Sequence, residues 1–205
     1  MKRQPVLGLR PTQFAIGMSE VEGKAKKLRR LSKKKLVKYV KQNPVKVICG
    51  PHRDLYVIDR HHTLMAYWLI GVKRVPVAID ENFSSQRMSH EKFWRFMSRH
   101  HLTHLYDQFG EGPHDALYLP VDIRGLSDDP YRSLAWMAQC KGAFGKSKVR
   151  YYEFDWAQLL RRRKLLSPAG RAQLRPALSA AIRLCRSPAA RKLPGYLPAR
   201  SQARG

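Results

Sequence analysis

Asp59, Arg60, His61 and His62 form the segment whose residue types and spacing are best suited to chemistry. A β-rich run precedes it and an apolar run, residues 64–70, follows it, so we expect these side chains at a strand end and a helix start. The N–H groups and dipole of a helix N-terminus favour phosphate. Asp59 would hold Mg²⁺, and the imidazoles would contact phosphate or relay protons. The spacing alone leaves an alternative, in which Asp59 is an N-cap and one histidine is packed or capping.

The residues around this segment predict the elements that position it. Residues 45–49 and 55–59 are β-rich runs separated by the turn 50–54, a pattern typical of a hairpin. The apolar helix of residues 64–70 ends at Gly71, and a further strand is expected over residues 75–79. The order strand, turn, helix, strand places residues 59–63 at the junction of sheet and helix.

A long basic helix is predicted before the hairpin, over about residues 19–42. Ser19 and Glu22 have the spacing of a capping box at its start. The apolar residues form only a narrow stripe along this helix, so most of its surface is cationic. The helix is expected to end at Asn43-Pro44. The densest cationic cluster on this helix is Lys33, Lys34 and Lys35.

The second half of the chain is predicted to be helical and then to become a tail. Helices are expected over residues 91–101, from Asp129-Pro130 onward, and over residues 156–166. Beyond residue 166 the composition shifts to Ala, Pro, Leu and Arg, which favours at most one short helix. We therefore expect one α+β domain over residues 1–166, a small mixed sheet wrapped by helices, followed by a basic tail over residues 167–205.

The charge of the chain is concentrated in its two flanks. Of a formal net charge of +25, residues 1–50 contribute 14 Lys/Arg against 2 acids and residues 146–205 contribute 15 against 2, while the centre is neutral. Polyanions are the natural partners of such flanks, because cations that bind phosphates release condensed counterions. A solvated basic surface is the alternative. The cations expected to bind nucleic acid are Lys33, Lys34, Lys35, Arg161, Arg162 and Arg163.

Composition also excludes several classes of protein. No run approaches the roughly 18 consecutive apolar residues of a membrane span, and the first residues lead into no apolar signal stretch. The 3 cysteines are scattered and do not suggest a disulfide framework. We expect a cytoplasmic protein without an integral membrane segment, associated with the nucleoid if its partner is nucleic acid. The sequence indicates no oligomeric state.

The run VIDRHHTLMA, residues 57–66, resembles the core motif of the ParB/sulfiredoxin superfamily. In that superfamily a strand enters a turn that grips phosphate. The match is closer to one branch, the ParB-like nuclease family, and it covers roughly residues 7–165. The other runs that carry the resemblance are LRPTQ (9–13), GMSEVE (17–22), EKFW (91–94), YD (106–107), DAL (115–117), DPYRSLA (129–135) and FDWA (154–157).

The resemblance implies several possible activities, because the superfamily includes CTP-dependent DNA clamps, a peroxiredoxin-repair enzyme and free-serine kinases. The reactive cysteine of the repair enzyme falls where this chain has His61, which disfavours that chemistry. The kinases use the turn Asp-Gly-His-Thr-Arg, which Asp59 and His61 match. Arg60 replaces its glycine and Thr63 its arginine, so Arg60 or Arg53 would supply the missing cation.

The remaining site residues also follow from the resemblance. Glu20 and Glu22 lie where the kinases draw a catalytic acid, although the capping box explains Glu22 equally well. The residues expected to bind a nucleotide triphosphate or other phosphate are Arg60, Thr63, His52 and Arg53. The first hypothesis is a Mg²⁺-dependent nuclease or nucleotide hydrolase. The alternatives are a non-catalytic DNA-binding, partition-like module and a kinase-like phosphotransferase acting on a small molecule.

Overall fold

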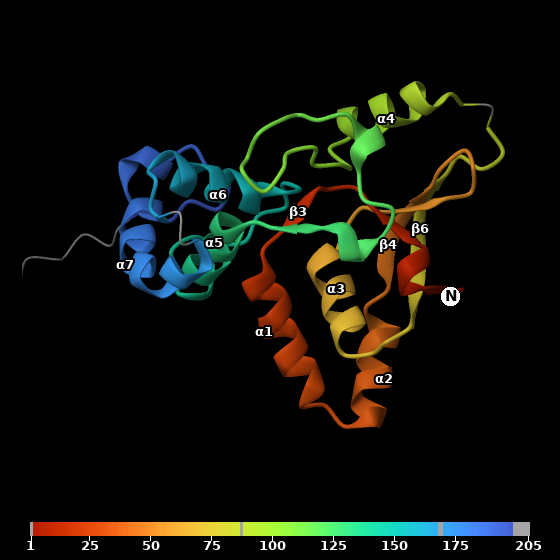
Figure 1. Ribbon diagram of the computed structural model, residues 1–205, viewed down its shortest axis with the longest axis horizontal. Helices are drawn as coiled ribbons and strands as arrows, with labels where there is room; N and C mark the ends of the chain where they lie inside the picture. Colours follow the sequence, from red (N-terminus) through yellow and green to blue (C-terminus); the bar gives the residue numbers. More distant parts are fainter. Residues whose placement is uncertain (1, 87, 168–169, 199–205) are drawn as a thin grey trace, which may run out of the picture. The chain divides into compact units, whose positions relative to one another are not determined.

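A computed structural model describes residues 2–86, 88–167 and 170–198 of the chain (Figure 1). It divides into two compact units, Met1–Asp128 and Asp129–Gly205. The boundary therefore lies at residue 128, whereas the sequence led us to expect a single domain up to residue 166. Each unit has its own hydrophobic core. None of the described helices is long and apolar enough to cross a membrane.

The first unit is built on a five-stranded mixed sheet in the order β1-β6-β4-β5-β2. β1 pairs with β6 and β4 with β5 in antiparallel fashion, whereas β2 and β5, and β4 and β6, are parallel. A separate parallel pair joins β3 to β7. The strands are β1 (Arg3–Pro5), β2 (Leu9–Pro11), β3 (Ala15–Ile16), β4 (Val45–Cys49), β5 (Leu55–Val57), β6 (Arg74–Asn82) and β7 (Ser127–Asp128).

Helices cover both faces of this sheet (Figure 1). One side holds α1 (Met18–Arg29), α2 (Lys33–Gln42) and α3 (His61–Leu69), and the other holds α4 (His90–Arg99). Side chains alternate along the strands: Val47 belongs to the core beneath the first three helices, and its neighbour Ile48 packs with Phe93 of α4. The predicted mixed α+β architecture is confirmed.

The predicted basic helix is two helices, and the predicted continuous helix over residues 19–42 is therefore wrong. α1 ends at Arg29, and Ser32 starts α2 by accepting a hydrogen bond from the Lys35 amide at 3.4 Å. The N-cap of α1 is Gly17, not Ser19. Asp128 Oδ1 accepts a hydrogen bond from the Met18 amide at 2.9 Å, so a residue 110 positions away helps to start this helix.

The α-helices described in the second unit are α5 (Pro130–Cys140), α6 (Tyr152–Arg162) and α7 (Leu174–Cys185), with the short 3-10 helices η4 (Gly170–Gln173) and η5 (Pro188–Ala190) before and after α7. Beyond residue 166 the sequence led us to expect a basic tail with at most one short helix; the structure has the 12-residue helix α7 there, and its apolar side chains pack in the core of the second unit, so the tail is not confirmed. Pro176 lies in the first turn of α7, where the missing N–H has no intrahelical partner. The side chains of α7 buried in the core of the second unit are Leu174, Ala177, Ala181 and Cys185.

Candidate functional site

The turn that follows β5 places His61 in the interior of the first unit. Its side chain is 3% exposed, and Nε2 accepts a hydrogen bond from the Thr12 amide at 3.2 Å. The ring also bonds the backbone of Val57, so a neutral ring carries its proton on Nδ1. Burial lowers the pKa of His61 to about 3. At neutral pH this imidazole is an uncharged acceptor that joins the chain after β2 to the start of α3.

His62 links two segments of the chain in the same way, through a ring nitrogen that accepts a backbone hydrogen bond. Its Nε2 accepts a hydrogen bond from the Gly17 amide at 3.0 Å, at the N-cap of α1. The same nitrogen lies 3.8 Å from Glu20 Oε2, and Glu20 Oε1 accepts a hydrogen bond from Lys24 Nζ at 2.6 Å. The structure thus brings together Glu20 and His62, two of the predicted catalytic residues, with Lys24.

Asp59 and Arg60 lie nearer the surface. Arg60 is the N-cap of α3 and has a left-handed backbone with φ of 70°. Its Nη1 donates to Asn43 Oδ1 at 3.0 Å, and its Nε lies 3.8 Å from Asp59 Oδ2. The Asp59 side chain is 51% exposed.

The fit of Mg²⁺ to this site depends on Asp59. Within the described residues, no three His, Cys, Asp or Glu side chains form a metal-binding group. Mg²⁺ is commonly held by one or two carboxylates together with water and substrate phosphates. Asp59 could therefore supply one carboxylate ligand, and water and a phosphate would have to supply the others.

A pocket of about 210 Å³ opens beside the start of α3. Thr63, in the first turn of α3, lies in its wall, and Lys24 and Lys27 of α1 line it as well. Within the described residues no acidic side chain pairs with Lys27, whereas Lys24 pairs with Glu20. We call this cavity the lysine pocket; its full lining is Lys24, Lys27, Leu28, Leu31, Tyr39 and Thr63.

Tyr67 lies one turn after Thr63 on the same face of α3. Its side chain is fully buried, and its hydroxyl has no hydrogen-bond partner among the described residues. Its ring meets that of Tyr39 edge to face, with the centroids 6.5 Å apart. Burial, with a smaller contribution from Tyr39, raises the pKa of Tyr67 to about 12, so its hydroxyl is neutral and remains a donor.

Other predicted site residues do not join this cluster. His52 and Arg53 are exposed in the turn between β4 and β5, at the opposite end of β5 from Asp59. Glu22 is exposed on α1. The predicted phosphate site thus keeps Arg60 and Thr63 near the start of α3, and His52 and Arg53 lie apart from them.

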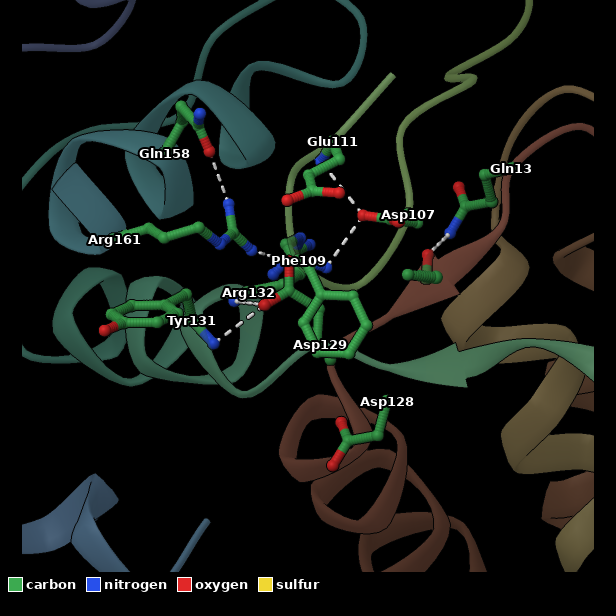
Figure 2. A network of polar contacts seen from close by, with 12 residues as sticks. Gln13, Asp107, Phe109, Glu111, Asp128, Asp129, Tyr131, Arg132, Gln158 and Arg161 are labelled. Carbon is green, nitrogen blue, oxygen red and sulfur yellow. Dashed lines mark hydrogen bonds and ion pairs between the residues drawn. The ribbon is translucent and has the colours of Figure 1, made fainter. Parts of the chain in front are cut away.

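The predicted nucleic-acid-binding cations also have different surroundings. Lys33, Lys34 and Lys35 are exposed at the start of α2, and Arg162 and Arg163 are exposed at the end of α6. Arg161 instead donates from Nη2 to Oδ2 of the buried Asp129 at 2.7 Å and from Nη1 to Gln158 at 2.5 Å (Figure 2). Within the second unit, Arg161 therefore serves an internal ion pair.

Figure 2 also shows how loops of the first unit are held. Asp107 Oδ1 accepts hydrogen bonds from the amides of Phe109 and Glu111, both at 2.9 Å. Its other oxygen lies 3.2 Å from His114 Nε2. The buried Gln13, from the first predicted motif, donates to the Ala15 carbonyl at 2.6 Å. In two of the runs that carry the family resemblance, residues 9–13 and 106–107, Gln13 and Asp107 therefore serve to hold loops together.

Sequence reasoning missed Lys24, Lys27 and Tyr39 as site residues. A signal was present for α1, because residues 24, 27, 28 and 31 have the i, i+3, i+4, i+7 spacing of one helix face. Two lysines and two leucines share that face, which is unusual for a purely solvated surface. No comparable signal marks Tyr39, whose position follows from the break between α1 and α2.

Comparisons with known proteins agree with this architecture. The family described as "Putative ParB-like nuclease" matches residues 3–162. The chain therefore belongs to this ParB-like family.

Two solved structures are similar to the chain in different degrees. The crystal structure of protein Atu1540 from Agrobacterium tumefaciens matches over 97% of this chain and 98% of that chain, with 33% identity and a TM-score of 0.85. The C-terminally truncated chromosome-partitioning protein ParB from Caulobacter crescentus, complexed to the centromeric parS site, aligns over 88% of this chain and 97% of that chain. Its identity of 11% and TM-score of 0.31 are too low to support a shared fold or ligand. No curated protein matches the chain.

Proposed function

We propose that this ParB-like protein binds the phosphate groups of a nucleotide in the lysine pocket and acts on them with Mg²⁺ held at Asp59. The observation that carries the proposal is the convergence of Lys24, Lys27 and Thr63 on one cavity at the start of α3. Ammonium groups and a helix N-terminus both favour a phosphate, and the Thr63 hydroxyl can donate to it. Glu20, which bonds the pocket residue Lys24, and His62, 3.8 Å from Glu20, are groups suited to proton transfer.

Replacement of Lys27 by alanine is expected to weaken nucleotide binding by about tenfold or more, because a charge-assisted hydrogen bond contributes about 1.5–3 kcal/mol. The measurement is thermal shift followed by calorimetric titration with CTP, ATP and ADP, each with and without Mg²⁺. A ligand that binds the native state raises its apparent melting temperature.

Lys26→Ala is the matched control, since Lys26 is an exposed cation of the same helix outside the pocket lining. It should leave the titration unchanged. The pocket assignment fails if no nucleotide shifts the wild type, or if Lys26→Ala and Lys27→Ala lose affinity equally.

The catalytic part of the proposal has its own experiment. Asp59→Asn removes the exposed carboxylate while keeping its shape, so we expect Mg²⁺-dependent hydrolysis of DNA, RNA or nucleotide to be lost and Mg²⁺-free nucleotide binding to be kept. Failure of the wild type to turn over any of these substrates would limit the pocket to binding. A phosphorylated small molecule formed from ATP or ADP without nucleic acid would assign kinase-like transfer instead.

A second candidate function is binding of nucleic acid by the basic flanks, favoured by the exposed lysine cluster on α2, a helix that contains no acidic residue. Replacing Lys33, Lys34 and Lys35 together by glutamine is expected to lower the slope of log affinity against log salt by about 2–3, because each phosphate contact contributes about 0.9. Fluorescence anisotropy with a DNA duplex measures it.

The opposite flank supplies the comparison for this experiment. Neutralising Arg162, Arg163 and Lys164, all exposed, tests whether the second unit contributes phosphate contacts of its own. An unchanged slope in both triple variants would show that the charge of these clusters does not bind DNA.

A further inference from the structure

A groove separate from the lysine pocket runs between α2 and the strands β1 and β6. It consists of two adjoining pockets of about 340 and 440 Å³ that share Arg3, Val37 and Val40. Tyr39 of α2 lines the lysine pocket, whereas Val37, Val40 and Lys41 line this groove, so the helix presents different residues to each. We call it the α2 groove; the rest of its lining is Leu36, Val72, Lys73, Arg74 and Pro76.

The floor of the α2 groove is aliphatic. Val40 is buried, but Val37 is 59% exposed, among the more exposed large apolar side chains of the described residues. Leu36, Val72 and Pro76 extend the apolar surface from the helix to β6 and the residues before it. Burying such a surface in a partner is favourable in proportion to its area. The floor lacks aromatic rings on which bases could stack, which disfavours single-stranded nucleic acid as its occupant.

The rim of the groove carries only positive charge. Arg3 Nη2 donates to the Arg74 carbonyl at 3.0 Å, and Arg74 Nη2 donates to the Arg3 carbonyl at 2.8 Å. These reciprocal bonds hold both guanidinium groups at the sheet edge without a carboxylate. Lys73 Nζ lies 4.5 Å from the centroid of the Trp68 ring. Within the described residues, no acid lines the groove or pairs with these cations or with Lys41.

We infer that the α2 groove is a docking site for an acidic segment of another protein whose apolar side chains fill the floor. Charge complementarity identifies the occupant: aliphatic residues contact the valines, and carboxylates contact the four cations of the rim. A second copy of this chain is a poor occupant, because it carries 40 Lys/Arg against 15 acids, and never more than two acids in succession. The partner is therefore a different, acidic protein.

The experiment selects peptides from a phage-displayed random library on the full-length protein, with counter-selection on Val37→Glu. Val37 is exposed enough for this substitution to leave the fold intact, which circular dichroism verifies. We expect enriched sequences that combine Asp or Glu with Leu, Ile or Phe. Synthetic copies should bind Val37→Glu and Lys41→Glu about tenfold more weakly than the wild type, the loss expected at a residue central to an interface.

The matched control is Lys34→Glu, which makes the same charge change as Lys41→Glu on the same helix but outside the groove. It should change the peptide affinity less than twofold. The inference is overturned if no peptide is enriched, if the enriched peptides lack acids, or if they bind Val37→Glu as well as the wild type. It is also overturned if Val37→Asn, which changes no charge, instead weakens binding to phosphatidylserine vesicles or duplex DNA, which would assign the groove to lipid or nucleic acid.

Discussion

Acidification from pH 7 to pH 4 is expected to destabilise the protein, and His61→Gln is expected to remove about 3 kcal/mol of that loss. The pKa of His61 is lowered from 6.5 to about 3 in the folded protein by burial. Between these values the unfolded chain binds a proton that the folded chain does not, so stability falls as the pH falls. The physical cause is local, because a protonated ring would direct a second N–H at the Thr12 amide.

Urea denaturation at a series of pH values measures this effect. Glutamine offers an acceptor for the Thr12 amide and a donor for the Val57 backbone, and it does not titrate. The variant should therefore keep both hydrogen bonds while losing this pH dependence of stability. His52→Gln is the matched control at an exposed histidine, and its pH profile should follow that of the wild type. Parallel profiles for the wild type and His61→Gln would show that His61 is not buried as described.

Asp129→Ala is expected to destabilise the second unit by about 3–5 kcal/mol, the cost typical of breaking a buried ion pair by removing one partner. Asp129 is 1% exposed, and its Oδ1 accepts hydrogen bonds from the amides of Tyr131 and Arg132 at 2.8 and 3.1 Å (Figure 2). Its Oδ2 bonds Arg161. Alanine therefore removes the N-cap of α5 and leaves the guanidinium without its carboxylate.

Two further variants separate these contributions in the same denaturation experiment. Asp129→Asn keeps an acceptor for the two amides but removes the charge, so its loss of stability should be smaller than that of Asp129→Ala. Arg162→Ala, at the exposed neighbour of Arg161, should change stability by less than about 0.5 kcal/mol. A loss below about 1 kcal/mol for Asp129→Ala would contradict the role assigned to the ion pair.

The elements set by local sequence were predicted well. The hairpin of β4 and β5 and the start of α5 at Asp129-Pro130 follow from short-range spacing, and the structure has them. The turn predicted over residues 59–63 is shorter in the structure, because α3 begins at His61 and not at Leu64. The start of α1 was predicted wrongly because contacts distant in sequence, from Asp128 and His62, decide where it begins. The apolar stripe of α7 was present in the sequence, but we gave more weight to the prolines of this region and predicted at most one short helix.

The candidate site was predictable in position and less so in composition. The turn at Asp59–Thr63 was identified from its residue types, yet those types do not reveal that the Nε2 atoms of His61 and His62 accept backbone hydrogen bonds. That depends on where residues 12 and 17 lie after folding. Lys24 and Lys27 reach the same region only because α1 packs beside α3, an arrangement that periodicity alone does not specify.

The position of α2 has a consequence for communication within the first unit. This helix of 10 residues forms a wall of the lysine pocket through Tyr39 and of the α2 groove through Val37 and Val40. A ligand that shifts the helix at one wall changes the free energy of binding at the other. Thermodynamic linkage makes such an effect reciprocal. The factor by which the peptide changes the affinity for phosphate equals the factor by which phosphate changes the affinity for the peptide. If both proposed ligands bind, this single short helix would lie between them and could couple the binding of a small anion to that of a protein partner.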